Sequence, residues 1–245
     1  PGENGFDVIQ RLIQHKLKGN ILFFQPGEFE ILQMIELLNN NTPDDIIAIP
    51  FYSSMSESKK QFVGDIYNNF KNLRISKTEN FTKVLDLTKG THIYNNYIIV
   101  ATNIAEASLT IKGLYYVIDT GTRKLPTYDY NKKSIVITTQ FISESNRLQR
   151  KGRVGRGVGE NGEVHYLYKQ NQLIENKIQY SISCEDIKDD LFNMLSDSVN
   201  NIFNINTYNH KIKTIRGIRF KKFDYLIKSN INTDKPYNYE GNPIH

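Results

Sequence analysis

The sequence predicts an α/β protein: a mostly parallel β-sheet with helices on both faces, a β-hairpin, and a C-terminal helical extension. Helical and strand-like patterns alternate along the first half of the 245 residues. The strand-like runs, such as "IIVA" and "YYVI", are apolar throughout rather than alternating between apolar and polar residues. Strands of that kind are buried on both faces, which is typical of parallel sheets between two layers of helices.

The first 70 residues are expected to supply three helices and two strands. The first helix rests on apolar residues at helical spacing, and Gly19 is expected to end it. Pro26 and Gly27 close the first strand, and Ser56 is a candidate N-cap for the third helix. In chain order the expected elements are a helix at 6–18, a strand at "NILFFQPG", a helix at 28–38, a strand at 46–50 and a helix at 56–70.

The next segments, "NYIIVATN" and "GLYYVIDTG", predict two more strands that end in polar residues. Open α/β sheets bind ligands at the carboxyl ends of their strands. Turn formers are also common there, and spacing alone slightly favours that second interpretation. The residues concerned are Thr102, Asn103, Asp119 and Thr120.

Residues 124–142 interrupt the alternation with two strand-like runs joined by a polar turn at 131–134, which predicts a β-hairpin. A last strand is expected at 164–168. We place the main domain at 1–180. Residues 181–245 are expected to form a helical extension that begins a following domain, with a winged helix as the candidate type.

Composition limits the classes of function. The single cysteine, Cys184, excludes an internal disulfide and Cys-rich zinc motifs, so we expect a reducing, intracellular setting and no metal site of that kind. No apolar run approaches the length of a membrane span, so no membrane partner is expected. The net charge of +5 permits an anionic partner such as RNA without requiring one.

The stretch "NRLQRKGRVGRGVGENGEVHYLY" contains a formal GxGxxG pattern at 157–162. A dinucleotide-binding loop follows a strand and begins a helix. Here the pattern follows a basic helical segment and leads into a strand, which is the reverse order. We therefore interpret these glycines as a turn.

The basic part of the same stretch has a different character. Arg153 and Arg156 share one face if the helix continues, and Gly152 and Gly155 lie between them at a cost of about 1 kcal/mol each relative to Ala. Two guanidinium groups beside Gln149 match the requirements of phosphoryl transfer, in which Arg neutralises developing charge and Gln orients water. A basic surface helix, or one that grips nucleic-acid phosphates, is favoured over catalysis on these residues alone.

Four segments, in order, resemble motifs of superfamily 2 RNA helicases of the DEAH/DExH type. "QRKGRVGR" matches the QRxGRxGR signature of motif VI at every defined position, and "IIVATNIAEASLTIKGLYYVIDTG" is similar to motif V with its following strand. "NILFFQPGEFEI" resembles motif IV and "IAIPFYSSMSESKKQFV" the motif after it. The resemblance covers roughly residues 6–170 and is nearest in style to the poxvirus-type nucleoside triphosphate phosphohydrolase II. It implies a RecA-like sheet of the P-loop NTPase type.

For the nucleotide, the resemblance implies that Gln149, Arg153 and Arg156 face the ATP γ-phosphate, the two arginines as arginine fingers. It implies that Asp119 bonds the ribose, and that Ser108 and Thr110 link RNA contact to the nucleotide. Phe62 is a candidate to stack on the adenine, and a core role for it is at least as well supported.

For RNA, the resemblance implies backbone contacts by Thr102 and Asn103, and by the amides around Gly27. Pro26-Gly27 replaces the family's usual Thr-Gly, so a side-chain hydroxyl is absent there. The implied activity is ATP-dependent unwinding of RNA in the 3′ to 5′ direction, with the hairpin acting near the strand exit.

Neither GxxxxGK[ST] nor Asp-Glu-x-His occurs in the chain. We therefore expect a second RecA-like domain that needs a first one to hold ATP and Mg²⁺, and that is inactive alone. If the source is viral, the expected location is the virion or the host cytoplasm. Two alternatives remain open at this point: a nucleic-acid-binding module, and a scaffold that has no ATPase activity.

Overall fold

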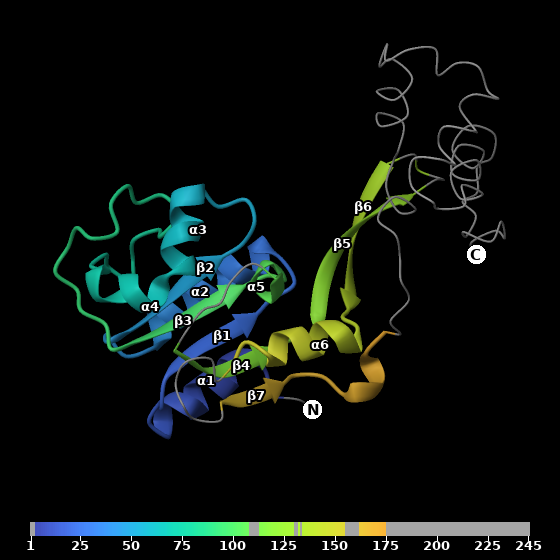
Figure 1. The fold of residues 1–245 in the computed structure, drawn as a ribbon, viewed down its shortest axis with the longest axis horizontal. Helices are drawn as coiled ribbons and strands as arrows, with labels where there is room; N and C mark the ends of the chain where they lie inside the picture. The colour runs from blue at the N-terminus through green and yellow to red at the C-terminus, as the bar shows by residue number, and fades with distance from the viewer. Residues whose placement is uncertain (1–2, 108–112, 130–131, 133, 155–161, 175–245) are drawn as a thin grey trace, which may run out of the picture. The chain divides into compact units, whose positions relative to one another are not determined.

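The computed structural model describes residues 3–107, 113–129, 132, 134–154 and 162–174. The order of helices and strands within these ranges follows the alternation expected from the sequence (Figure 1). The elements are α1 Gly5–Gln14, β1 Asn20–Phe24, α2 Glu28–Asn41, β2 Ile46–Phe51, α3 Glu57–Gly64, α4 Ile66–Asn69, the 3-10 turn η1 Phe70–Asn72, β3 Asn96–Ala101, α5 Ile104–Ala107, β4 Leu114–Asp119, β5 Thr122–Asp129, β6 Ser134–Phe141, α6 Glu144–Lys151, β7 Glu163–Tyr166 and the 3-10 turn η2 Gln170–Gln172.

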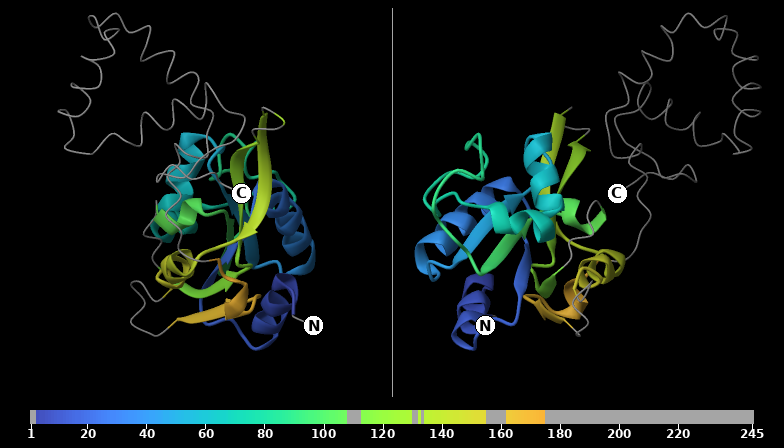
Figure 2. Two further views of the ribbon diagram at one scale, coloured as in Figure 1. Left: turned by 90° about the vertical axis from the view of Figure 1, so that its right-hand side faces the viewer. Right: turned by 60° about the vertical axis from the view of Figure 1, so that its left-hand side comes forward.

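Five strands form the central sheet in the order β2-β3-β1-β4-β7, and every neighbouring pair is parallel. The register places Phe24 at the end of β1 beside Ala101 of β3 and Asp119 of β4. Helices α1 and α2 cover one face, and α3 to α6 cover the other (Figure 2). The residues that follow β1, β3 and β4 are therefore brought to one edge of the sheet.

The central strands form because their side chains are apolar on both faces. Ile21, Leu22 and Phe24 of β1 have no exposed surface, and neither do Ile98 and Val100 of β3. Burying such a side chain contributes roughly 1.5–3 kcal/mol. The predicted parallel sheet with helices on both faces is thus confirmed.

Three helix ends differ from the predictions. The first helix ends at Gln14 rather than near Gly19, because Lys16 takes a left-handed backbone conformation with φ of 61°. The helix expected over 56–70 is broken at Asp65, directly after Gly64, and Ser56 makes no side-chain capping bond. Helix α6 ends at Lys151, so Arg153 lies beyond it.

The predicted hairpin is present as the two-stranded sheet of β5 and β6. Its residues 125–138 belong to a separate compact unit from the central sheet. On β6, Ile135 and Ile137 lie two residues apart with about two thirds of their surface exposed. The predicted extension at 181–245, and with it the boundary at 180, lies outside the described residues.

Candidate functional site

Helix α6 carries the basic residues of the "QRKGRVGR" segment. It begins with a capping box in which the Ser143 hydroxyl and the Asn146 side chain each accept from the other's backbone amide. Gln149 is exposed, whereas its neighbour Arg150 has no exposed surface. The two faces of the short helix therefore have different roles, one open and one buried.

Arg150 is the centre of a buried ionic network. Its Nε donates to the Glu106 carboxylate at 2.7 Å and its Nη1 to the Asp119 carboxylate at 2.6 Å. The guanidinium carbon lies 4.6 Å from the centre of the Phe24 ring. Both carboxylates are buried, so these charge-assisted bonds act at low dielectric and fix α6 to the sheet.

The Asp119 side chain is fully occupied by this network. Besides Arg150, it accepts a bond from the Gly121 amide and, at 2.9 Å, one from the Tyr168 hydroxyl. Burial, followed by the adjacent Asp119 charge, raises the pKa of Tyr168, so that hydroxyl stays protonated and donates. The carboxylate has no exposed surface in this structure, and its expected bond to the ribose stays a prediction.

Gly121 shapes the same region. Its φ of +71° is a conformation that favours glycine, and a Cβ there would lie 2.3 Å from a carbon of the Tyr168 ring. The glycine therefore allows Tyr168 to reach Asp119.

Arg153 is half-buried just after α6, where its guanidinium donates to the backbone carbonyl of Glu106. Glu106 belongs to α5, the single helical turn that follows the end of β3. Thr102 and Asn103 directly precede that turn, and the Asn103 carbonyl accepts from the Glu106 amide at 2.9 Å. Among the predicted site residues, Arg153, Thr102 and Asn103 are therefore brought to one short segment.

Thr102 is half-buried and Asn103 is exposed, so the amide side chain of Asn103 is open to a ligand. Three other predicted site residues, Arg156, Ser108 and Thr110, lie outside the described residues.

Gly27 precedes α2 as its N-cap in an extended conformation. The Lys124 side chain lies over it: a Cβ on Gly27 would be 2.7 Å from Lys124 Cδ and 2.9 Å from its Nζ. The same ammonium pairs with Glu30 of α2 at 2.8 Å. A cation and the positive end of a helix dipole thus meet at Gly27, and Glu30 balances them.

Phe62 lies on α3 and is half-buried against the core. Its ring meets Phe81 edge to face, with ring centres 6.3 Å apart. These contacts favour the core role over adenine stacking.

The donor set fits phosphate oxygens better than a metal ion. Arg153 and Gln149 offer N–H donors, while the nearby carboxylates of Glu106 and Asp119 are buried and already bonded to Arg150. Within the described ranges, no three His, Cys, Asp or Glu side chains group so as to hold a metal ion. Nor is any helix of those ranges long and apolar enough to cross a membrane.

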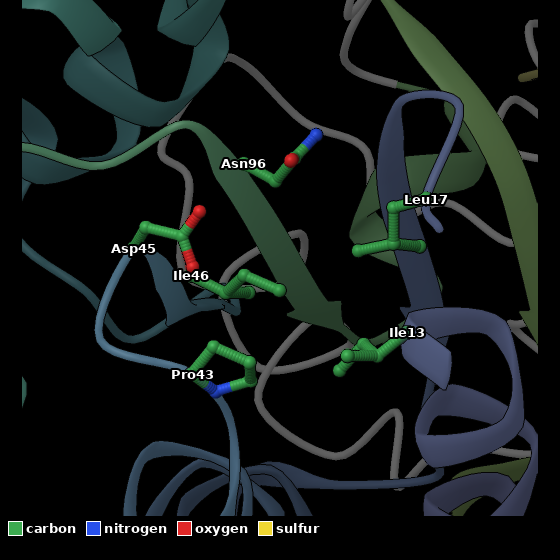
Figure 3. A pocket seen from close by; sticks show the side chains of 6 residues that line it. All are labelled: Ile13, Leu17, Pro43, Asp45, Ile46 and Asn96. Carbon is green, nitrogen blue, oxygen red and sulfur yellow. The ribbon is translucent and has the colours of Figure 1, made fainter. Parts of the chain in front are cut away.

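A pocket of about 200 Å³ lies at the opposite edge of the sheet, where β2 and β3 begin (Figure 3). Its one carboxylate, on Asp45, accepts a bond from the Asn95 side chain at 2.7 Å. None of the predicted site residues lines it. The remaining lining comes from Ile13, Leu17, Pro43, Ile46 and Asn96.

Sequence reasoning missed three residues that the structure brings to the site: Glu106, Tyr168 and Lys124. Glu106 lies inside the segment that resembles motif V, so its position in that motif was an available signal. Tyr168 and Lys124 meet their partners only through the fold, 49 and 94 residues apart in sequence.

Comparison with known proteins agrees with the fold. Residues 4–158 match the helicase conserved C-terminal domain family. A protein of Acanthamoeba polyphaga mimivirus whose name includes "ATP-dependent RNA helicase" is 34% identical over 231 residues, covering 89% of this chain and 13% of the relative. ATP-dependent RNA helicase HrpA of Escherichia coli is 31% identical over 169 residues, covering 69% of this chain and 11% of HrpA.

Among solved structures, the DExH-box NTPase HrpB of E. coli superposes with a TM-score of 0.57 and 25% identity, over 80% of this chain and 22% of HrpB. The chain thus spans between about a tenth and a quarter of the length of these relatives. It is similar to proteins named ATP-dependent RNA helicases, has the RecA-like fold, and belongs to the helicase conserved C-terminal domain family.

Proposed function

We propose that this chain is the second motor domain of a helicase that unwinds RNA in the 3′ to 5′ direction. A first RecA-like domain of the same protein would hold ATP and Mg²⁺. One observation carries the proposal: Arg153, from the segment resembling motif VI, bonds the carbonyl of Glu106 in the turn that follows Thr102 and Asn103. The candidate nucleotide and RNA contacts therefore share one short turn of backbone.

At the nucleotide, Arg153 and Arg156 act as arginine fingers on the γ-phosphate, and Gln149 orients the attacking water. Arginine suits this role because its fork of N–H donors matches phosphate oxygens and its charge is permanent. Such a finger accelerates phosphoryl transfer by about 10³- to 10⁵-fold. Ser108 and Thr110 would connect the nucleotide to RNA. Arg150 is not available for this chemistry, since it is buried between two carboxylates.

At the RNA, Thr102 and Asn103 contact the sugar-phosphate backbone, and the amides around Gly27 receive a phosphate with Lys124 beside it. Contacts of this kind position a strand without reading its bases. Binding should therefore depend on salt and show little sequence preference.

The test is Arg156→Ala in the intact protein that carries both motor domains. We expect RNA-stimulated ATP hydrolysis to fall by about 10³-fold or more, while RNA binding survives. Lys151→Ala, an exposed cation of the same segment, is the matched control and should retain activity. Near-normal turnover by Arg156→Ala would remove the finger assignment. A wild-type protein that binds RNA without hydrolysing ATP would favour a nucleic-acid-binding module or a scaffold instead.

A further inference from the structure

Glu106 makes more connections than any role assigned so far requires. Its side chain, 6% exposed, accepts from Arg150 Nε at 2.7 Å and from Asn146 Nδ2 at 2.8 Å. Its backbone carbonyl accepts from Arg153, and its backbone amide donates to the Asn103 carbonyl at 2.9 Å. One residue thus links a proposed RNA contact, Asn103, to a proposed arginine finger, Arg153.

The side-chain bonds of Glu106 decide where α5 lies. Arg150 is fixed to the sheet by Asp119, at 2.6 Å, and Glu106 then joins α5 to α6 through the same guanidinium. Asn146 holds the second carboxylate oxygen from the first turn of α6. Because the carboxylate is buried and bonded at both oxygens, a displacement of α5 would break charge-assisted bonds at low dielectric.

The backbone of Glu106 connects the position of α5 to the position of Arg153. The Arg153 guanidinium donates to the main-chain carbonyl of Glu106, so a movement of this turn moves one of its hydrogen-bond acceptors. RNA bound at Thr102 and Asn103 would act on the other end of the same turn. A misplacement of about 1 Å can cost a reaction about 10²-fold in rate.

We propose that Glu106 is a positioning residue that couples RNA bound at Thr102 and Asn103 to the placement of Arg153 at the nucleotide. It touches neither RNA nor ATP and acts through the turn α5 and through Arg150. The inference rests on the function proposed above, because it takes the RNA contacts and the arginine finger from there.

The test is Glu106→Gln in the intact protein, with ATP hydrolysis measured with and without saturating single-stranded RNA. Gln keeps the shape but removes the charge and turns an N–H₂ group toward Arg150 or Asn146, both of which are donors there. We expect the ratio of RNA-stimulated to RNA-independent turnover to fall by about tenfold, equivalent to about 1.4 kcal/mol. RNA affinity and the KM for RNA should stay within about twofold, a change of less than about 0.5 kcal/mol.

Glu106→Asp keeps the charge and tests the same idea if Glu106→Gln folds poorly. Its shorter side chain should give an intermediate loss of the stimulation ratio. Both variants are compared with the wild type by melting temperature and by the fraction of protein molecules that are active. If both ATPase rates fall by the same factor, or the ratio is unchanged, Glu106 is only structural and the proposal is overturned.

Arg153→Ala separates this inference from the proposed function. Should Arg153→Ala retain normal turnover, the finger assignment fails, and the coupling through Glu106 fails with it. Should Arg153→Ala lose turnover while Glu106→Gln keeps full RNA stimulation, only the coupling inference is wrong.

Discussion

Replacing Arg150 with methionine should destabilise the packing of α5 and α6 against the sheet. Arg150→Met keeps a long apolar side chain against Phe24 but leaves the carboxylates of Glu106 and Asp119 without their cation. The Glu106 side chain is 6% exposed and the Asp119 side chain has no exposed surface. Each of the two short bonds that disappear contributes about 1.5–3 kcal/mol, as hydrogen bonds to charged groups do. Removing one partner of a buried ion pair generally costs about 3–5 kcal/mol. We therefore expect a loss of about 3–5 kcal/mol in the free energy of unfolding.

The measurement is urea unfolding of this chain followed by far-UV circular dichroism, since the chain contains no tryptophan. Lys151→Met is the matched control: it removes a cation from the adjacent, exposed position of α6 and should change stability by no more than about 0.5 kcal/mol. A loss below about 1 kcal/mol for Arg150→Met would show that the network does not hold α5, α6 and the sheet together.

Two further predictions concern RNA and pH. Lys124→Ala should weaken RNA binding uniformly across sequences and reduce by about 1 the slope of log affinity against log salt concentration. Lys89→Ala, which removes an exposed lysine, is the control and should leave that slope unchanged. An unchanged slope for Lys124→Ala, in titrations at several salt concentrations, would exclude Lys124 as a phosphate contact. His165 has a pKa lowered first by burial and then by the charge of Arg11, so the unfolded chain, with its His pKa of about 6.5, binds the proton more readily than the folded one. The free energy of unfolding should therefore decrease as pH falls from about 6.5 through the folded pKa, and His165→Gln should flatten this decrease in chemical unfolding measured across that range. An equal slope in both proteins would refute it.

The parallel sheet could be predicted because its strands carry their own signal. Runs such as "NILFF" and "LYYVID" are apolar on both faces, and the structure buries all but Asn20 of these residues. No tertiary context is needed to recognise such a strand, and this is why its boundaries came within a residue or two of those observed.

The buried face of α6 could not be found in the same way. The residues that point inward, Ser143, Asn146 and Arg150, are spaced as a helix requires but are all polar, so hydrophobic periodicity gives no signal. The sequence distinguishes Arg153 by its place in the QRxGRxGR signature, but only the fold places the carboxylates of Glu106 and Asp119 around Arg150. The burial of Asp119 could not be foreseen for the same reason, since Arg150 and Tyr168 reach it from two other segments.

Helix ends were predicted less well than strands because they depend on single backbone conformations. Lys16 ends α1 in a left-handed conformation that lysine rarely adopts, and no residue in that stretch signals it. The break after Gly64 did have a local signal, since glycine weakens a helix interior by about 1 kcal/mol.

We propose above all that Arg153 acts on the nucleotide rather than on RNA or on folding. Single-turnover hydrolysis of ATP by Arg153→Ala, in the intact protein with RNA bound, tests it most directly. We predict that the rate of the chemical step falls by about 10³-fold or more while RNA affinity and melting temperature are retained. A near-normal rate of the chemical step, or a loss of RNA binding that explains the lost turnover, would contradict the account.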